Sequence, residues 1–313
     1  LVADSVLFSV KETPRFNPIS IAGAHVRDAG ANAVEEMGTT LANGLAYVDT
    51  FRERGGDVEA FCRRLSFFFY VHMDFFEEIA KFRAGRALWA KLLSERYGIT
   101  DEKALRFRFG VVCGGSSLTA AQPYNNIVRV GIENMAAVLG GAQSIFTAAY
   151  DEAFQIPTET SAEIALRTQQ IVAHESGIAR TVDPLGGSWH VEWLTERMEE
   201  AIRGVMDEID AYGGVEKAIE DGWLQARVAE RARQRKQSLD SGERVVVGEN
   251  FFRREDGDND FGEVFRLDPE VARRVREKFE KVMDERDNAA AERALARLET
   301  AAAGEENVMP HIV

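Results

Sequence analysis

Leu65-Ser-Phe-Phe-Phe-Tyr-Val71 and the amphipathic run over residues 74–98 form the clearest strand–helix signal in this chain. The first stretch is short, apolar and aromatic, which predicts a buried strand. In the second, apolar residues recur on one helical face. Asp74 followed by Glu77 is the pattern of a capping box, and Gly98 is a suitable residue to end the helix. We therefore predict a strand that leads directly into a helix.

The same unit recurs three more times in the first two-thirds of the sequence. Further strands are predicted at residues 19–25, 105–113 and 142–147, with helices at 31–45, 123–141 and 161–175. Four successive strand–helix units predict an α/β fold with a parallel sheet covered by helices. Both a doubly wound sheet and a (β/α)8 barrel give this pattern. A barrel needs about 250 residues and eight units, so half of it would come from residues before Leu1.

The character of the sequence changes after about residue 183. Helices are predicted at 189–211, 215–221, 224–236 and 268–303, with a lone short strand at 245–250 and an acidic loop at 254–260. This part is too polar to form its own core. We expect it to wrap around a barrel or to lead to another domain.

The composition excludes several classes of function. The 313 residues include 38 Lys and Arg against 52 Asp and Glu, a net charge of −14, which argues against nucleic acid or an anionic membrane as the main partner. No window approaches the roughly 20 apolar residues of a spanning helix. Two cysteines and no secretory signal fit a reduced, cytoplasmic protein without disulfides or a thiolate zinc site. The first residue is not Met and the last ones are apolar, so we expect a piece of a longer protein.

Candidate reactive residues follow the predicted strands, because functional groups of parallel α/β folds gather at strand carboxyl ends. His25 follows a Gly-Ala pair and could donate to a substrate carbonyl, or it could be a structural histidine. His72 is more typical of a helix entry than of a ligand. Cys113 could be a nucleophile, but a buried small residue fits its neighbourhood better.

Weaker signals accompany these residues. Residues 114–117 could hold an anion on backbone N–H groups, and Arg63-Arg64 beside Ser66 could hold a phosphate or could be solvated. Residues 183–187 are typical of a turn. No His, Asp or Glu cluster has metal-ligand spacing. The residues alone therefore predict half a barrel with a histidine at a strand end, and they assign no reaction.

Longer blocks of sequence resemble a known family. The blocks are residues 16–30, 64–69, 75–89, 122–129, 151–153, 157–158, 183–188, 240–242 and 247–248. In order and nearly without gaps, they resemble the large subunit of methylmalonyl-CoA mutase and its acyl-CoA mutase relatives. The resemblance implies that residues 1–182 are strands five to eight of a substrate-binding barrel. Residues 183–313 would then be a helical wrap that leads toward a cobalamin-binding domain or subunit.

The resemblance also implies an activity, cofactor and partners. Family members isomerise an acyl-CoA by radical chemistry with adenosylcobalamin, whose cobalt ligand would lie outside this chain. Implied partners are the acyl-CoA, the remaining half-barrel, the cobalamin-binding domain or small subunit, and a G-protein chaperone. We expect a dimer or hetero-oligomer, because an open half-barrel leaves two sheet edges unpaired.

Individual residues match family positions. His25 matches the histidine that hydrogen-bonds the thioester carbonyl, where it would stabilise developing charge. Arg15, Arg64 and Ser66 match positions that hold the coenzyme A arm, with Arg15 in place of a lysine. The residues that match cobalamin or adenosyl contacts are Asp28, Gly115, Glu152, Ala153 and Ile156.

Other residues depart from the family pattern. Ala24 stands where the family has Tyr, and Val112 and Ala148 replace a Gln and an Asn near the adenosyl ribose. Cys113 and Phe146 belong to the same altered strand ends. These changes predict a wider, less polar pocket and a substrate bulkier or less polar than methylmalonyl-CoA. The alternative is a non-catalytic barrel subunit that pairs with an active partner.

Overall fold

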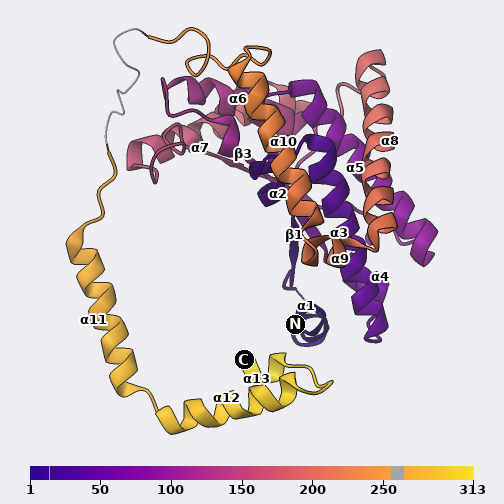
Figure 1. Ribbon diagram of the computed structural model, residues 1–313, viewed down its shortest axis with the longest axis vertical. Helices are drawn as coiled ribbons and strands as arrows, with labels where there is room; N and C mark the ends of the chain where they lie inside the picture. The colour runs from indigo at the N-terminus through magenta and orange to yellow at the C-terminus, as the bar shows by residue number, and fades with distance from the viewer. Residues whose placement is uncertain (14, 255–263) are drawn as a thin grey trace.

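Four parallel strands form the centre of the computed structural model, which describes residues 1–13, 15–254 and 264–313 (Figure 1). They are β1 (Ser20–Ala22), β2 (Ser66–Val71), β3 (Phe109–Cys113) and β4 (Ser144–Thr147), and they lie side by side in sequence order. A doubly wound sheet would reverse its strand order at a switch point. The unbroken order is instead consistent with part of a barrel.

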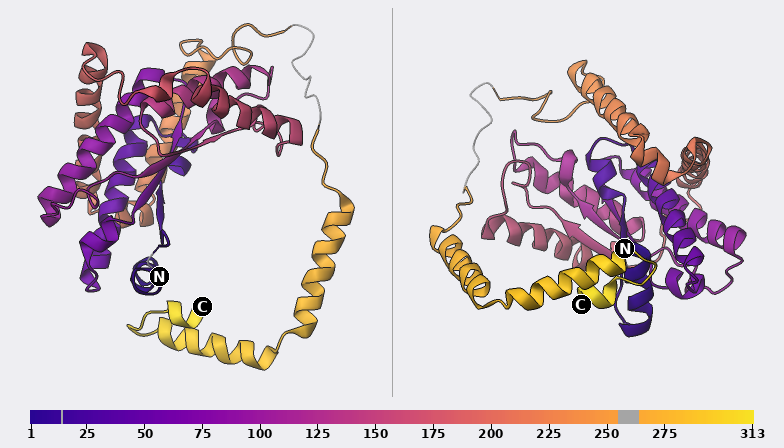
Figure 2. Two further views of the ribbon diagram at one scale, coloured as in Figure 1. Left: turned by 180° about the vertical axis from the view of Figure 1, so that it is seen from behind. Right: turned by 60° about the horizontal axis from the view of Figure 1, so that its bottom comes forward.

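The two faces of the sheet differ. On the covered face, Phe67 and Phe69 of β2 and Phe109 of β3 pack against helices. The ring centroids of Phe67 and Trp89 are 4.9 Å apart, and those of Phe109 and Phe82 are 4.6 Å apart. Alternate residues point the other way. On this open face the strand register places Tyr70, Val112 and Phe146 in one row, and no helix of the described chain lies over it (Figure 2).

Helices follow each strand as the sequence predicts. They are α2 (Ala24–Asp28), α3 (Ala33–Glu53), α4 (Val58–Cys62), α5 (Phe75–Tyr97), α6 (Asn125–Leu139) and α7 (Glu159–His174), preceded by α1 (Val2–Glu12). Gly98 ends α5 in the left-handed conformation, as predicted. The predicted capping box at Asp74 is wrong, because its side chain makes no cap hydrogen bond. The box lies at α3, where Asn32 accepts from the Glu35 N–H at 2.8 Å.

The second part of the chain is mostly helical, with α8 (Trp189–Tyr212), α9 (Val215–Glu220), α10 (Trp223–Asp240), α11 (Pro269–Glu285), α12 (Asn288–Ala302) and α13 (Met309–Ile312). Ile202 and Met206 of α8 join the core between α3 and α5. In contrast, α11 and α12 form an arc away from the sheet, and α13 returns to α1, where Ser5 donates to Met309 (Figure 1).

Two predictions in this part are corrected. Residues 245–250 form no strand. Instead, Val247 makes an isolated bridge to Phe251, because Gly248 turns the chain at a φ of +82°. The predicted single helix at 268–303 is two helices, since Asp287 caps a new one. Most of the predicted acidic loop lies outside the described residues. Among the described residues, none of the helices combines the length and apolar character needed to span a membrane.

Candidate functional site

Three of the residues that match cobalamin contacts come together at the carboxyl end of the sheet. The short turn after β3, Gly115–Ser117, presents two backbone N–H groups. The Gly115 N–H donates to Glu152 at 3.0 Å, and the Ser116 N–H donates to Asp28 at 2.8 Å. Carboxylates from the ends of β1 and β4 therefore hold the turn after β3. Burial raises the pKa of Glu152, and the negative charges of Asp28 and Asp151 raise it further. The hydrogen bond from the Gly115 N–H lowers this pKa, but by less.

Tyr70 completes this cluster, and our interpretation of the sequence missed it. Gly115 has a φ of +63°, and a Cβ there would lie 2.6 Å from the Tyr70 ring and 2.9 Å from the Asp28 carboxylate. Burial raises the pKa of the Tyr70 hydroxyl to about 12, together with the negative charges of Asp28, Glu152 and Glu36. The period-2 pattern of β2 places Ser66, Phe68 and Tyr70 on one face, and that signal could have identified it.

Buried charges fix the end of β2 beneath Tyr70. Lys81 contacts Glu36 at 2.7 Å and Glu78 at 2.5 Å, and Arg27 contacts Glu78 at 2.8 Å. Glu36 also accepts from the Tyr70 N–H, while Lys81 donates to the Tyr70 carbonyl. Burial raises the pKa of Glu36, opposed by the charges of Lys81 and Arg27. The strand end is therefore held by side chains of α2, α3 and α5.

His25 lies in α2, just after β1, and its side chain is exposed. The preceding Gly23 permits this position, because a Cβ there would lie only 2.2 Å from the Thr40 hydroxyl and 3.0 Å from the Phe69 ring. Ala24 is buried. Ala153 and Ile156, beyond the end of β4, are both exposed. Their predicted roles remain predictions.

The altered strand-end residues divide between the faces. Val112 and Phe146 are register partners on the open face, beside Tyr70. Cys113 lies on the covered face and is fully buried. Burial and the charges of Glu133 and Glu78 raise the pKa of its thiol well above the usual range, which excludes a ready nucleophile. Ala148 is buried against Gly114, whose Cβ would lie 2.3 Å from it.

A basic cavity lies at the amino end of the sheet. It has a volume of about 380 Å³, and its arginines are Arg15, Arg63, Arg64 and Arg108. Ser66 accepts from Asn17 at 2.6 Å at its edge. Burial and the charge of Arg64 lower the pKa of Arg108. Arginines gathered in this way suit phosphate groups. Arg64 and Ser66 are thus placed together, at the end of the sheet opposite to His25.

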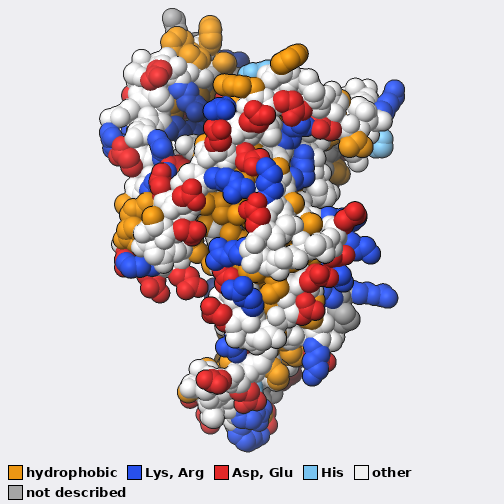
Figure 3. Space-filling view, turned by 90° about the vertical axis from the view of Figure 1, so that its right-hand side faces the viewer, with side chains coloured by type: hydrophobic (Ala, Val, Ile, Leu, Met, Phe, Trp, Pro, Cys, Tyr) orange, Lys and Arg blue, Asp and Glu red, His pale blue; other side chains and the backbone are white. Residues whose placement is uncertain are grey.

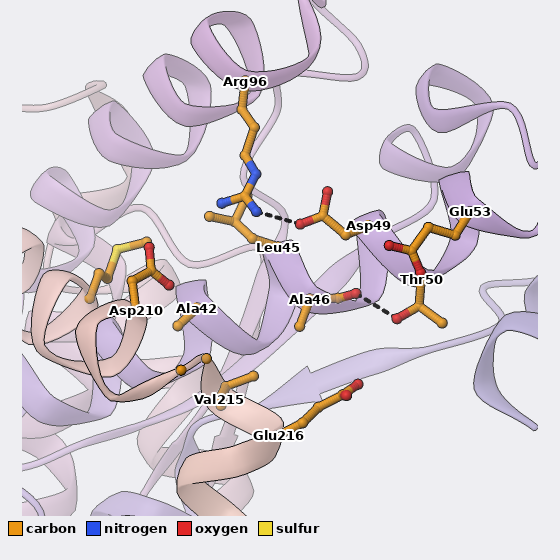
Figure 4. Close-up of a pocket in the computed structure, with 13 residues that line it drawn as sticks. Ala42, Leu45, Ala46, Asp49, Thr50, Glu53, Arg96, Asp210, Val215 and Glu216 are labelled. Carbon is orange, nitrogen blue, oxygen red and sulfur yellow. Dashed lines mark hydrogen bonds and ion pairs between the residues drawn. The ribbon is translucent and has the colours of Figure 1, made fainter.

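Other cavities offer less chemistry. One of about 250 Å³ lies between α3 and the α8–α9 region, and its main charged contact is an ion pair of Arg96 with Asp49 at 2.5 Å (Figure 4). Its arginine is paired within the protein, and its other charged lining residues, Glu53, Asp210 and Glu216, are acidic. No group of three or more potential metal-ligating side chains gathers among the residues that the structure describes.

The sequence is similar to known proteins along nearly all of its length. The family model described as methylmalonyl-CoA mutase matches residues 1–313. The large subunit of 2-hydroxyisobutanoyl-CoA mutase from Aquincola tertiaricarbonis is 42% identical over 311 residues, which are 99% of this chain and 55% of that protein. Mitochondrial methylmalonyl-CoA mutase from Homo sapiens is 44% identical over 99% of this chain and 41% of its own length. The chain thus spans about half the length of the curated relatives it matches.

Proposed function

Because this chain belongs to the methylmalonyl-CoA mutase family, we propose that it provides the acyl-CoA-binding barrel half of a cobalamin-dependent acyl-CoA mutase, an isomerase. In this proposal β1 to β4 are strands five to eight of the barrel, within residues 1–182. Residues 183–313 are the helical wrap that leads toward a cobalamin-binding domain or subunit. The one-sided helix cover and sequential strand order support this assignment.

The observation that carries the proposal is the placement of two chemistries at opposite ends of one open face. The arginine cavity at the amino end suits the phosphates of coenzyme A, with Arg15, Arg64 and Ser66 on the arm. His25 lies at the carboxyl end, where it would donate to the thioester carbonyl. An acyl-CoA would then extend along the open face.

The residues at the carboxyl end fit a flat, bulky cofactor. When bound, adenosylcobalamin would supply the radical that starts the rearrangement. The turn after β3 has glycine at positions 114 and 115, and carboxylates hold its backbone in place, so a large ring could approach closely. Asp28, Gly115, Glu152, Ala153 and Ile156 would contact it, and the cobalt ligand would come from outside this chain.

The shape of the pocket bears on the acyl group. Ala24 and Ala148 are small, while Val112 and Phe146 form an apolar row with Tyr70. We expect a substrate bulkier or less polar than methylmalonyl-CoA. One relative is named for 2-hydroxyisobutanoyl-CoA, whose acyl carbon beside the thioester carries two methyl groups and so needs such width.

The test uses the full-length protein with its cobalamin-binding partner and adenosylcobalamin. Turnover should be highest with a branched acyl-CoA, and a cobalt(II) radical signal should appear in its presence. Turnover of methylmalonyl-CoA without turnover of any branched acyl-CoA would contradict the proposed substrate class. The alternative, a non-catalytic barrel subunit, would account for Val112 and Ala148 in place of polar family residues, but the relatives, which are named as mutases, do not favour it. The absence of a radical signal with every acyl-CoA would support it instead.

The remaining partner predictions belong to this proposal. The relative named as a large subunit supports a hetero-oligomer or a partner domain. The G-protein chaperone, the dimer and the cytoplasmic location stay predictions, and several relatives are named as mitochondrial. Figure 3 shows basic and acidic side chains mixed on the side of the molecule that carries α8, and the absence of a nucleic-acid partner stays a prediction.

A further inference from the structure

Two adjoining cavities lie near the carboxyl end of β2, between the β2–α5 loop and the segment from α10 to Val247. Their volumes are about 350 and 690 Å³, and they share His72, Met73, Arg235, Arg244 and Val245. None of the residues that match coenzyme A or cobalamin positions lines either cavity. They are therefore separate from the site proposed above.

The smaller cavity, which we call the anion cavity, carries an excess of positive charge. Arg129, Arg235 and Arg244 line it, and among the residues that the structure describes no acidic side chain does. Arg235 donates to the Ser116 carbonyl at 2.8 Å, and Arg129 to the Val247 carbonyl at 2.6 Å, so both bind neutral groups. In the described parts of the chain, none of the three arginines forms a salt bridge.

His72 adds an unpartnered polar atom to this cavity. Its side chain is 5% exposed, and its Nε2 has no hydrogen-bond partner among the described residues. Burial lowers the pKa of His72 well below the usual value, and the positive charges of Arg27, Lys81, Arg235 and Arg244 lower it further. A buried ring nitrogen beside several cations, with no partner, is the arrangement that a bound anion would complete.

The rest of the wall is mostly apolar, with Ser117 and Asn125 as its uncharged polar residues. Its apolar lining residues are Met73, Val128 and Val245–Val247. The larger cavity differs, because Asp74, Glu77 and Glu243 line it beside its arginines. An anion would therefore prefer the smaller cavity, and the valines would favour a ligand with an apolar body.

We propose that the anion cavity binds a small organic anion, with a phosphate or carboxylate group between Arg235, Arg244 and His72 Nε2 and an apolar part on Met73 and Val245–Val247. The ligand would not take part in the mutase reaction. Its cavity is nonetheless linked to the cobalamin-side cluster, because Ser116, which accepts from Arg235, donates its N–H to Asp28.

The experiment measures binding of butyl phosphate, inorganic phosphate and butanol to the full-length protein by calorimetry. Butyl phosphate should bind with the highest affinity and butanol should not bind. Arg244→Gln should weaken butyl phosphate at least about tenfold, because Arg244 is exposed enough to be replaced without loss of folding and yet lines the cavity. Arg253→Gln, at an exposed arginine outside the cavity, is the matched control and should have no effect.

Two further measurements distinguish this site from the basic cavity at the amino end. Arg64→Gln should leave the affinity for butyl phosphate unchanged. In histidine-labelled protein, butyl phosphate should shift the ring signals that His72→Gln removes, and leave those of His174 and His311 in place. Binding that is lost with Arg64→Gln, retained with Arg244→Gln, or silent at His72 would overturn the proposal, whatever the outcome of the mutase assay.

Discussion

At the scale of single residues, the proposed reaction depends most on His25. His25→Ala should lower kcat by about 100-fold to 1,000-fold with a smaller effect on KM, because the imidazole would stabilise charge that develops on the thioester oxygen. His25 is exposed, so folding should be unaffected. Steady-state kinetics of the full-length enzyme with cobalamin checks this, and His174→Ala is the control. Equal loss in both variants would argue against a role for His25.

Tyr70 gives a prediction on pH dependence. Its pKa is raised to about 12 from an ordinary value near 10, so the folded state binds its proton more tightly than the unfolded state. The contribution to the free energy of unfolding is therefore complete below pH 10 and is lost as pH rises from 10 to 12. An ultraviolet titration should show one tyrosine fewer ionising near pH 12 in Tyr70→Phe. A Tyr70 signal at pH 10 would contradict the burial that we describe.

The residue scale also marks the limit of what the sequence predicts. The pattern of β2 predicts that Phe67 and Phe69 are buried, because alternation assigns them to one face. It does not predict that Tyr70 meets Asp28 and Gly115, since that contact depends on the positive φ of Gly115 and on the strand register. Cys113 was assigned to the pocket with Val112, yet neighbours in a strand point to opposite faces.

At the scale of elements, Lys81 joins its own helix, α5, to α3 and to the end of β2. Lys81→Met removes the cation between Glu36 and Glu78 and leaves both carboxylates buried, which should lower the free energy of unfolding by about 3–5 kcal/mol. Lys91→Met lies on the same helix and breaks an exposed pair with Glu199, so its effect should stay within about 1 kcal/mol. Urea unfolding compares the two. Similar urea midpoints for the two variants would mean that the buried charges around Lys81 do not hold the end of β2.

Elements were predicted well where local periodicity and burial agree. The four strands lie within or close to their predicted ranges, because each is a short apolar run between turns. Residues 245–250 were predicted as a strand on the same apolar signal. There the Val247 carbonyl accepts from Arg129, and Gly248 turns the chain back, so no strand of the described residues pairs with the segment. A strand needs a partner, and local sequence does not show one.

At the scale of the whole molecule, the arc of α11 and α12 encloses space beside the open face, as Figure 2 shows from two sides. Val271, Val275, Phe279 and Val282 form one stripe along α11, and all are exposed. An exposed apolar stripe of this length is typical of a surface that another part of the protein covers. Under the proposed function, that part is the remaining barrel half, around which the chain would wrap.

This assignment predicts a difference between the chain alone and the full-length protein. The backbone amides of α11 should exchange with solvent rapidly in the isolated chain and slowly in the full-length protein, because burial of the stripe would suppress local opening. Phe279→Glu should restore rapid exchange in the full-length protein and lower its melting temperature, since a buried carboxylate there would have no partner. Lys278→Glu also adds negative charge but lies outside the stripe, so it should do neither. Rapid exchange of α11 in the full-length protein would mean that the stripe stays uncovered and that the arc does not wrap around the barrel.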